Sequence, residues 1–286
     1  MKINTKLKTK QILEQYDIRA NKRYGQNFLI DDNVLKSIID ISNIKDDELV
    51  IEIGPGLGNL TEYILQYSSY AILVEIDNKM IDVLNDRFKT KGNYTLINED
   101  ILKTDIDDII KNIEKKNNKK YNKIKVVANL PYYITTPIIF KLLQDSKRID
   151  QITVMVQKEV AKRMVAVPKT KDYGILTLMV DYLSDAKIEL EVLNTSFIPS
   201  PDVTSSVILL KKKNKYMLNE EKEKELFELI HKAFAQRRKK MINSLVSTSF
   251  CSKEKLEKVF KLLALNSNIR AEELPLDTFI QIVEKL

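Results

Sequence analysis

The chain has 286 residues and is 44% hydrophobic, enough for one large domain and a smaller one or for two domains, while no apolar run approaches the ~20 residues of a membrane span. A single cysteine, Cys251, and a single histidine, His231, exclude a disulfide framework and most histidine chemistry, so we expect no metal and a reducing, cytoplasmic location. The net charge of +7 gathers at the ends, since residues 1–24 carry seven basic and two acidic side chains and residues 211–286 carry seventeen and eleven. This pattern indicates a polyanionic partner, and a solvated lysine-rich surface is the alternative.

The N-terminal arm is basic, and a short helix is expected near Gln11–Tyr16. The polar and aromatic segment 21–30 follows, which we interpret as a lid over a cofactor or, alternatively, as a loop that packs its apolar residues into the core. Asp31 and its neighbour are expected to cap a helix over Asn33–Ile41, because a carboxylate there can accept the first free backbone N–H groups.

The most informative stretch is Glu52-Ile-Gly-Pro-Gly-Leu-Gly58, which follows the apolar run Leu49–Ile51. Three of the six glycines fall within five positions, and glycine permits positive φ and close approach of a ligand to the main chain. A strand, a glycine turn and a helix, here expected over Asn59–Gln66, build a nucleotide site at the carboxyl end of a strand. An ordinary tight turn is the alternative.

The glycine spacing distinguishes between cofactors. Dinucleotide sites use G-x-G-x-x-G and place a pyrophosphate on the following helix N-terminus. Here the spacing is G-x-G-x-G, with Glu52 two residues before the first glycine, which is the pattern of S-adenosylmethionine (SAM) methyltransferases. SAM has no phosphate, so the loop needs only to pass closely over its amino-acid end and ribose. We therefore expect SAM as the cofactor and exclude a NAD-dependent dehydrogenase.

Two further apolar runs are predicted to be strands that lead into acidic residues. Ala71–Val74 ends at Glu75, about 20 residues after the glycine turn, where a carboxylate can accept the ribose hydroxyls. A helix over Lys79–Phe88 follows, and the strand Tyr94–Ile97 then leads to Asp100, which can accept the adenine amino group. A helix cap or a solvated turn is the alternative for Asp100.

The second decisive motif follows a strand over Ile124–Ala128 and reads Asn129-Leu-Pro-Tyr-Tyr133. An exocyclic amino group of a nucleobase is a poor nucleophile, because its lone pair is delocalised into the ring. The amide oxygen of Asn129 and the carbonyl of Leu130 can each accept one N–H, which frees the lone pair, while Tyr132 can stack on the base. A target base inside a helix would have to be extruded. A structural turn is the alternative.

The rest of the first part continues the α/β pattern. The Lys- and Asn-rich residues 111–123 are interpreted as a solvated surface insertion, and Thr135 is expected to cap a helix that runs to Leu143. Phe197 opens a proline-rich loop and is expected to cover the other face of the target base, with core packing as the alternative. The further elements expected are a strand over Ile152–Gln157, helices over Lys158–Val167 and Gly174–Leu183, and strands over Ala186–Val192 and Val203–Leu210.

Residues 213–286 are helical, charged and free of glycine, so we expect a small all-helical domain that begins there. A helix starting near Asn219 presents an apolar stripe that includes Phe227 and Phe234. The basic cluster Gln236–Lys240 suits phosphate groups. Two more helices are expected over Lys253–Leu265 and Asp277–Glu284.

Together these segments resemble the KsgA/RsmA ribosomal RNA adenine dimethyltransferases along nearly the whole chain. The segments that carry the resemblance are Asn21–Leu29, Glu52–Gly58, Val74–Asp77, Asn129–Tyr133, Gln157–Val160, Phe197–Pro201 and Ala235–Lys240.

The resemblance implies an α/β fold: a Rossmann-like SAM-dependent methyltransferase domain over residues 1–212, with helices on both faces of the sheet, and a helical RNA- or ribosome-contacting domain over residues 213–286. It implies that a monomer transfers two methyl groups to N6 of each of two adjacent adenosines near the 3′ end of 16S rRNA in the assembling small subunit. Cofactor contacts fall on Asn27, Leu29, Gly54, Glu75, Asp100 and Asn129, and base contacts on Asn129, Leu130, Tyr132 and Phe197.

One loop departs from the family pattern. The usual Pro-x-Pro-Lys-Val-Asp-Ser is here Pro199-Ser-Pro-Asp-Val-Thr-Ser205, so one expected basic contact is in doubt. An erythromycin-resistance-type enzyme acting on large-subunit rRNA stays open as an alternative, although segments 21–29 and 235–240 favour the small-subunit enzyme. A third possibility is an assembly or transcription factor that keeps the fold without relying on catalysis.

Overall fold

The computed structural model describes residues 4–19, 26–213, 218–236 and 239–286. The chain forms two compact units, one from residues 1–161 with 187–212 and one from residues 162–186 with 213–286. One border between the units falls at 212/213, where the sequence analysis placed the start of the helical domain, but segment 162–186 groups with the C-terminal helices. The reason is local packing, because the Tyr173 hydroxyl donates to the Leu274 carbonyl at 2.8 Å. The separate catalytic and RNA-contacting roles of the two parts stay a prediction.

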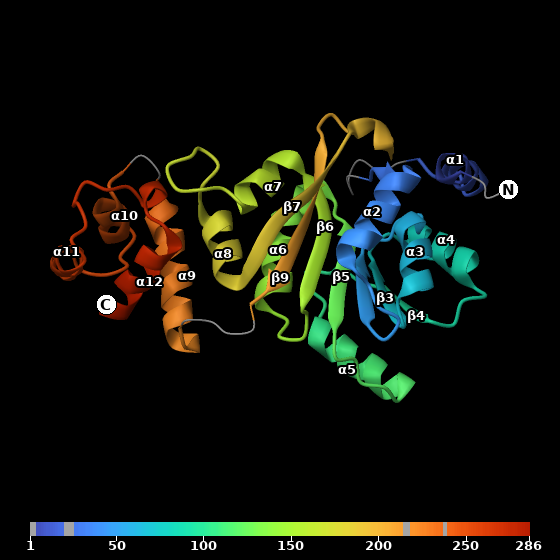
Figure 1. Ribbon diagram of the computed structural model, residues 1–286, viewed down its shortest axis with the longest axis horizontal. Helices are drawn as coiled ribbons and strands as arrows, with labels where there is room; N and C mark the ends of the chain where they lie inside the picture. Colours follow the sequence, from blue (N-terminus) through green and yellow to red (C-terminus); the bar gives the residue numbers. More distant parts are fainter. Residues whose placement is uncertain (1–3, 20–25, 214–217, 237–238) are drawn as a thin grey trace. The chain divides into compact units, whose positions relative to one another are not determined.

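A seven-stranded sheet, in the order β4-β3-β2-β5-β6-β9-β7, forms the centre of the fold, with helices on both of its faces (Figure 1). The first five strands in this order are parallel, and β9 runs antiparallel to β6. The order reverses between β2 and β5, and ligands of open α/β sheets bind in the crevice at such a point. The strands are β2 (Leu49–Ile53), β3 (Tyr70–Glu75), β4 (Tyr94–Asn98), β5 (Ile124–Asn129), β6 (Gln151–Gln157), β7 (Ser184–Val192) and β9 (Ser205–Lys212).

The strand predictions are confirmed, because unbroken apolar runs become strands covered on both sides: every residue of β2 and of β3 is buried. A small second sheet pairs β1 (Phe28–Leu29) antiparallel with β8 (Phe197–Ile198). In this sheet Leu29 lies opposite Phe197 and Phe28 opposite Ile198. The ladder holds segment 26–30 against the proline-rich loop, and Phe28 and Leu29 are buried, as the core-packing alternative to a lid predicts.

The helices around the sheet agree with the predictions in kind and differ at several ends. Asp31 caps α2 as expected, accepting from the Asn33 backbone N–H at 2.9 Å. The helical segment near the N-terminus is longer than expected. The helices are α1 (Thr5–Gln15), α2 (Asp32–Ser42), α3 (Asn59–Tyr67), α4 (Asn78–Phe88), α5 (Ile106–Asn117), α6 (Thr135–Gln144) and α7 (Lys158–Met164).

Two sequence interpretations are wrong. Residues 111–117 are the second half of α5 and not a loop-like insertion, because Ile106, Ile110 and Ile113 form a buried stripe at helical spacing. Thr135 does not cap α6: Ile134 occupies the cap position, and the Thr135 hydroxyl donates to the Pro131 carbonyl at 3.0 Å.

The second unit is helical, as predicted. Asn219 caps α9 by accepting from the Lys222 backbone N–H at 2.9 Å, and Phe234 stacks on Phe279 with ring centroids 6.2 Å apart. The short helix α10 was not predicted. The helices are α8 (Ile175–Leu183), α9 (Glu220–Phe234), α10 (Met241–Ser247), α11 (Lys253–Leu262) and α12 (Leu276–Lys285).

Parts of two predicted segments, residues 21–25 and 237–238, lie outside the described residues. Within the part of the chain that the structure describes, no helix has the length and apolar character needed to cross a bilayer.

Candidate active site

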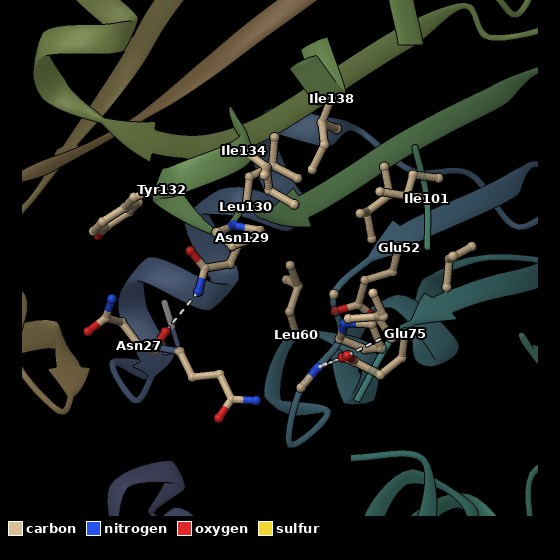
Figure 2. Close-up of a pocket in the computed structure, with 18 of the residues that line it drawn as sticks. Asn27, Glu52, Leu60, Glu75, Ile101, Asn129, Leu130, Tyr132, Ile134 and Ile138 are labelled. Carbon is tan, nitrogen blue, oxygen red and sulfur yellow. Dashed lines mark hydrogen bonds between the residues drawn. The ribbon is translucent and has the colours of Figure 1, made fainter. Parts of the chain in front are cut away.

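A cavity of about 230 Å³ opens at the carboxyl ends of β2 and β5, where the strand order reverses (Figure 2). The Gly54 turn and the Asn129 side chain, 75 positions apart in sequence, both line it. The structure therefore brings the two motifs together on one cavity. The predicted site residues that line it are Asn27, Leu29, Gly54, Glu75, Asp100, Asn129, Leu130 and Tyr132.

The glycine turn follows directly from β2 and needs its glycines. Gly54, Gly56 and Gly58 have φ of 63°, 55° and 80°, a region that disfavours other residues. A Cβ on Gly56 would lie 3.3 Å from the Phe28 ring, and one on Gly58 would lie 2.6 Å from the Phe88 ring. The turn is thus closely packed against two aromatic rings, and Gly54 and Gly56 line the cavity, which fits a cofactor that passes close to the backbone.

Glu75 ends β3 and is held by main-chain donors. One carboxylate oxygen accepts from Gly56 N at 3.0 Å, and the other accepts from Ile76 N and Asp77 N, each at 2.9 Å. Burial raises the pKa of Glu75, and these hydrogen bonds act in the opposite direction. Three of the roughly four acceptor positions of the carboxylate are taken, so its orientation towards the glycine turn is fixed.

Glu52 is a cavity residue whose ionisation the sequence did not reveal. Its side chain is buried, and burial together with the nearby charge of Glu75 raises its pKa to about 8, against the opposing effects of Thr61 and Arg87. The Thr61 hydroxyl donates to it at 2.6 Å. A carboxyl group with this pKa is mostly protonated at pH 7. The only sequence signal was an acid between the apolar residues of a buried strand.

Three apolar residues, Ile76, Ile101 and Leu102, line the cavity together with Asp100. Asp100 is half-buried and accepts from the Leu102 backbone N–H at 3.0 Å. Apolar side chains beside one carboxylate suit a flat heterocycle that carries an amino group. The sequence analysis did not name these apolar residues, although each lies next to or near a predicted acidic contact.

The motif after β5 is held in place by hydrogen bonds to neighbouring segments. Asn129 Nδ2 donates to the Asn27 carbonyl at 3.1 Å, so its amide oxygen points away from Asn27 (Figure 2). Leu130 N donates to the Met155 carbonyl at 3.1 Å. The Tyr132 hydroxyl and Ser205 Oγ lie 2.6 Å apart, which ties the ring to the start of β9.

Phe197 lies elsewhere. It is 3% exposed, packs with Leu29 and Leu35 in the hydrophobic core, and does not line the cavity. This placement corresponds to the core-packing alternative, and contact of its ring with a target base stays a prediction. Among the described residues, no group of three His, Cys, Asp or Glu side chains has an arrangement that could hold a metal ion.

The glycine turn between β2 and α3, the fixed carboxylate that ends β3 and the Asn129–Tyr132 turn all lie on one cavity. This combination is typical of a Rossmann-like, SAM-dependent methyltransferase. Residues 18–286 match the family model described as ribosomal RNA adenine dimethylase. The chain belongs to this family, and SAM is its cofactor.

Relatives of known name agree with this assignment. The ribosomal RNA small subunit methyltransferase A of Clostridium acetobutylicum is 41% identical over 278 residues, which cover 97% of this chain and 98% of that protein. The protein of the same name from Lachnoclostridium phytofermentans is 44% identical over 279 residues, covering 96% and 94%.

Solved structures show the same architecture. A dimethyladenosine transferase from Plasmodium falciparum superposes with a TM-score of 0.74 at 26% identity, covering 89% of this chain and 95% of that one. The 23S rRNA methyltransferase ErmE superposes with a TM-score of 0.67 at 21% identity, covering 91% and 99%, and at this identity it supports the fold alone.

Proposed function

We propose that the enzyme transfers two methyl groups to N6 of each of two adjacent adenosines near the 3′ end of 16S rRNA, within the assembling small ribosomal subunit. The observation that carries the proposal is the shared cavity of the Gly54 turn and the Asn129 amide. The names of the relatives, at 40% identity or more over nearly the whole chain, support the small subunit as the substrate.

The cofactor side of the cavity suits the parts of SAM. Asn27 and Leu29 form one wall, the Gly54 turn forms the wall beside it, and Glu75 offers a fixed carboxylate to the ribose. Asp100 and the apolar side chains of Ile76, Ile101 and Leu102 would receive the adenine. Bound SAM supplies an electrophilic methyl group on its sulfonium.

On the target side the chain's own groups activate the amine. The Asn129 amide oxygen and the Leu130 carbonyl would each accept one N–H of the exocyclic amino group, which localises the lone pair on nitrogen for attack on the methyl carbon. Tyr132, held by Ser205, would stack on the base and fix its plane. The methylated nitrogen is acidic and loses its proton to water, so no strong general base is required.

RNA binding would depend mainly on attraction between basic side chains and the RNA phosphates. The basic N-terminal arm and the C-terminal residues 211–286 each carry a positive excess, and neutralised phosphates supply most sequence-independent affinity. We place the enzyme in the cytoplasm, where ribosomal subunits assemble, and expect it to act as a monomer.

The test offers isotopically labelled SAM to the full chain with immature small subunits and, separately, with large subunits, followed by mass spectrometry of the nucleosides. N6,N6-dimethyladenosine at two adjacent positions of 16S rRNA is the expected product. Labelling of the large subunit alone would overturn the assignment of the substrate.

A further inference from the structure

Asn59 is a buried amide that the catalytic scheme leaves without a role. It is the first residue of α3, directly after Gly58, and its side chain is almost fully buried. Its Nδ2 donates to the Leu29 carbonyl and to the Thr9 hydroxyl, each at 2.9 Å, and its Oδ1 accepts from Arg87 Nη1 at 3.2 Å. Both amide protons and the amide oxygen are therefore used, and the partners come from three separate segments.

Arg87 connects Asn59 to the glycine turn by hydrogen bonds to both. Its Nη1 also donates to the Leu57 carbonyl, and its Nη2 lies 2.8 Å from a Glu62 carboxylate oxygen. Leu29, Leu57 and Asn59 itself all line the cavity. Two side chains, Asn59 and Arg87, thus link the wall formed by β1 with the wall formed by the glycine turn.

Helix α1 completes this arrangement from outside the cavity. Thr9 is fully buried at its contact with Asn59. Ile12 packs with Phe28 and Leu57 in one apolar cluster, so α1 lies behind the same two walls. The Lys8 ammonium meets Glu62 at 2.6 Å, which adds a second polar tie between α1 and α3.

We propose that Asn59 is a positioning residue that sets the spacing of the two cofactor-contacting walls, and that α1, through Thr9, is part of the SAM site although it lies outside the cavity. If the Leu29 carbonyl loses its donor, it is left as a buried unsatisfied acceptor and the wall must shift to find another partner. The cost is expected first in cofactor binding, because the hydrogen bonds of Asn59 go to Thr9, Leu29 and Arg87, whereas Asn129 is held separately by the Asn27 carbonyl. The inference concerns SAM and does not depend on which RNA is methylated.

The test uses three variants of the full chain. Asn59→Asp keeps the side-chain shape and the acceptor for Arg87 but cannot donate to Leu29 or Thr9. Thr9→Val replaces the hydroxyl on α1 that accepts from Asn59 with a methyl group, and Thr9→Ser keeps the hydroxyl. We expect the SAM dissociation constant to rise about tenfold in Asn59→Asp and a few fold in Thr9→Val, with Thr9→Ser close to wild type. Turnover at saturating SAM stays within about twofold in all three.

A matched control separates positioning from general loss of stability. Ser42→Ala removes another buried hydroxyl of the same unit, which donates to the Ile38 carbonyl at 2.7 Å and does not line the cavity. It should lose stability and keep its affinity for SAM by calorimetry without RNA. The proposal is overturned if Asn59→Asp and Thr9→Val bind SAM like wild type, or if Ser42→Ala weakens SAM equally. If Asn59→Asp does not fold, the comparison of Thr9→Val with Thr9→Ser decides alone.

Discussion

Glu52 makes the stability of the fold depend on pH, and a single substitution should remove that dependence. Its carboxyl group is buried with a pKa of about 8, whereas an ordinary glutamate in the unfolded chain ionises near 4.5. The folded state therefore keeps a proton that the unfolded state releases. Since the folded pKa is the raised one, the stabilising effect is fully present below the unfolded pKa and is lost as the pH rises through the folded pKa.

The magnitude follows from the two pKa values. Between pH 4.5 and 8 the unfolded chain binds one proton fewer at this site, so stability falls by about 1.4 kcal/mol per pH unit, or about 5 kcal/mol across the window. Glu52→Gln is neutral throughout and keeps an oxygen that can accept from Thr61. Its free energy of unfolding, relative to wild type, should therefore increase steadily from pH 5 to pH 8.

The assay is chemical denaturation of both proteins at pH 5.5, 6.5 and 7.5, since every other titrating group contributes to both curves alike. At pH 7 the neutral glutamine resembles the protonated glutamate, so Glu52→Gln should also bind SAM within a few fold of wild type. A difference in stability that does not change with pH would show that Glu52 is ionised in the folded protein, and the reasoning from burial would fail.

Four further outcomes are expected. Asn129→Ala should bind SAM and RNA within a few fold of wild type but lose at least about 100-fold in methyl transfer, because the acceptor for the amine is gone; retained turnover in single-turnover assays would refute this role. Glu75→Ala should raise the SAM dissociation constant about 10- to 100-fold by calorimetry, while an unchanged value would remove Glu75 from the site. Gly54→Ala should cost about 1–2 kcal/mol from its positive φ alone, and Gly58→Ala clearly more, since its Cβ would meet the Phe88 ring at 2.6 Å; equal melting temperatures would contradict the packing argument. RNA affinity should fall steeply between 50 and 200 mM salt, and a flat response would argue against the phosphate contacts of the basic ends.

Much of the fold could be predicted because its signals are local. Unbroken apolar runs marked the buried parallel strands, and closely spaced glycines marked the turn after β2, where positive φ is required at Gly54, Gly56 and Gly58. The helix α5 was missed because its lysines and asparagines dominate the composition, while the three isoleucines that bury it are spread over two turns.

The parts of the site that escaped prediction depend on contacts between distant segments. Phe197 is buried because β8 pairs with β1, about 170 positions away, and no local sequence pattern predicts that pairing. The neutral state of Glu52 depends on burial and on the nearby charge of Glu75, both of which exist only in the folded chain. In the sequence, Asn59 was only the expected first residue of a helix. Its proposed positioning role depends on hydrogen bonds with Thr9, Leu29 and Arg87, which meet only in the folded chain.

The reversal of strand order places the predicted methyl-donor groups and the predicted methyl-acceptor groups on two different halves of one sheet. Most of the groups suited to the methyl donor follow β2, β3 and β4, whereas those suited to the acceptor follow β5 and reach to β9 through Tyr132 and Ser205. Asn129 is a predicted contact of both ligands and is bonded to Asn27, so it joins the two sides. Changes of nucleic-acid selectivity that preserve donor affinity are therefore expected in the residues that follow Asn129.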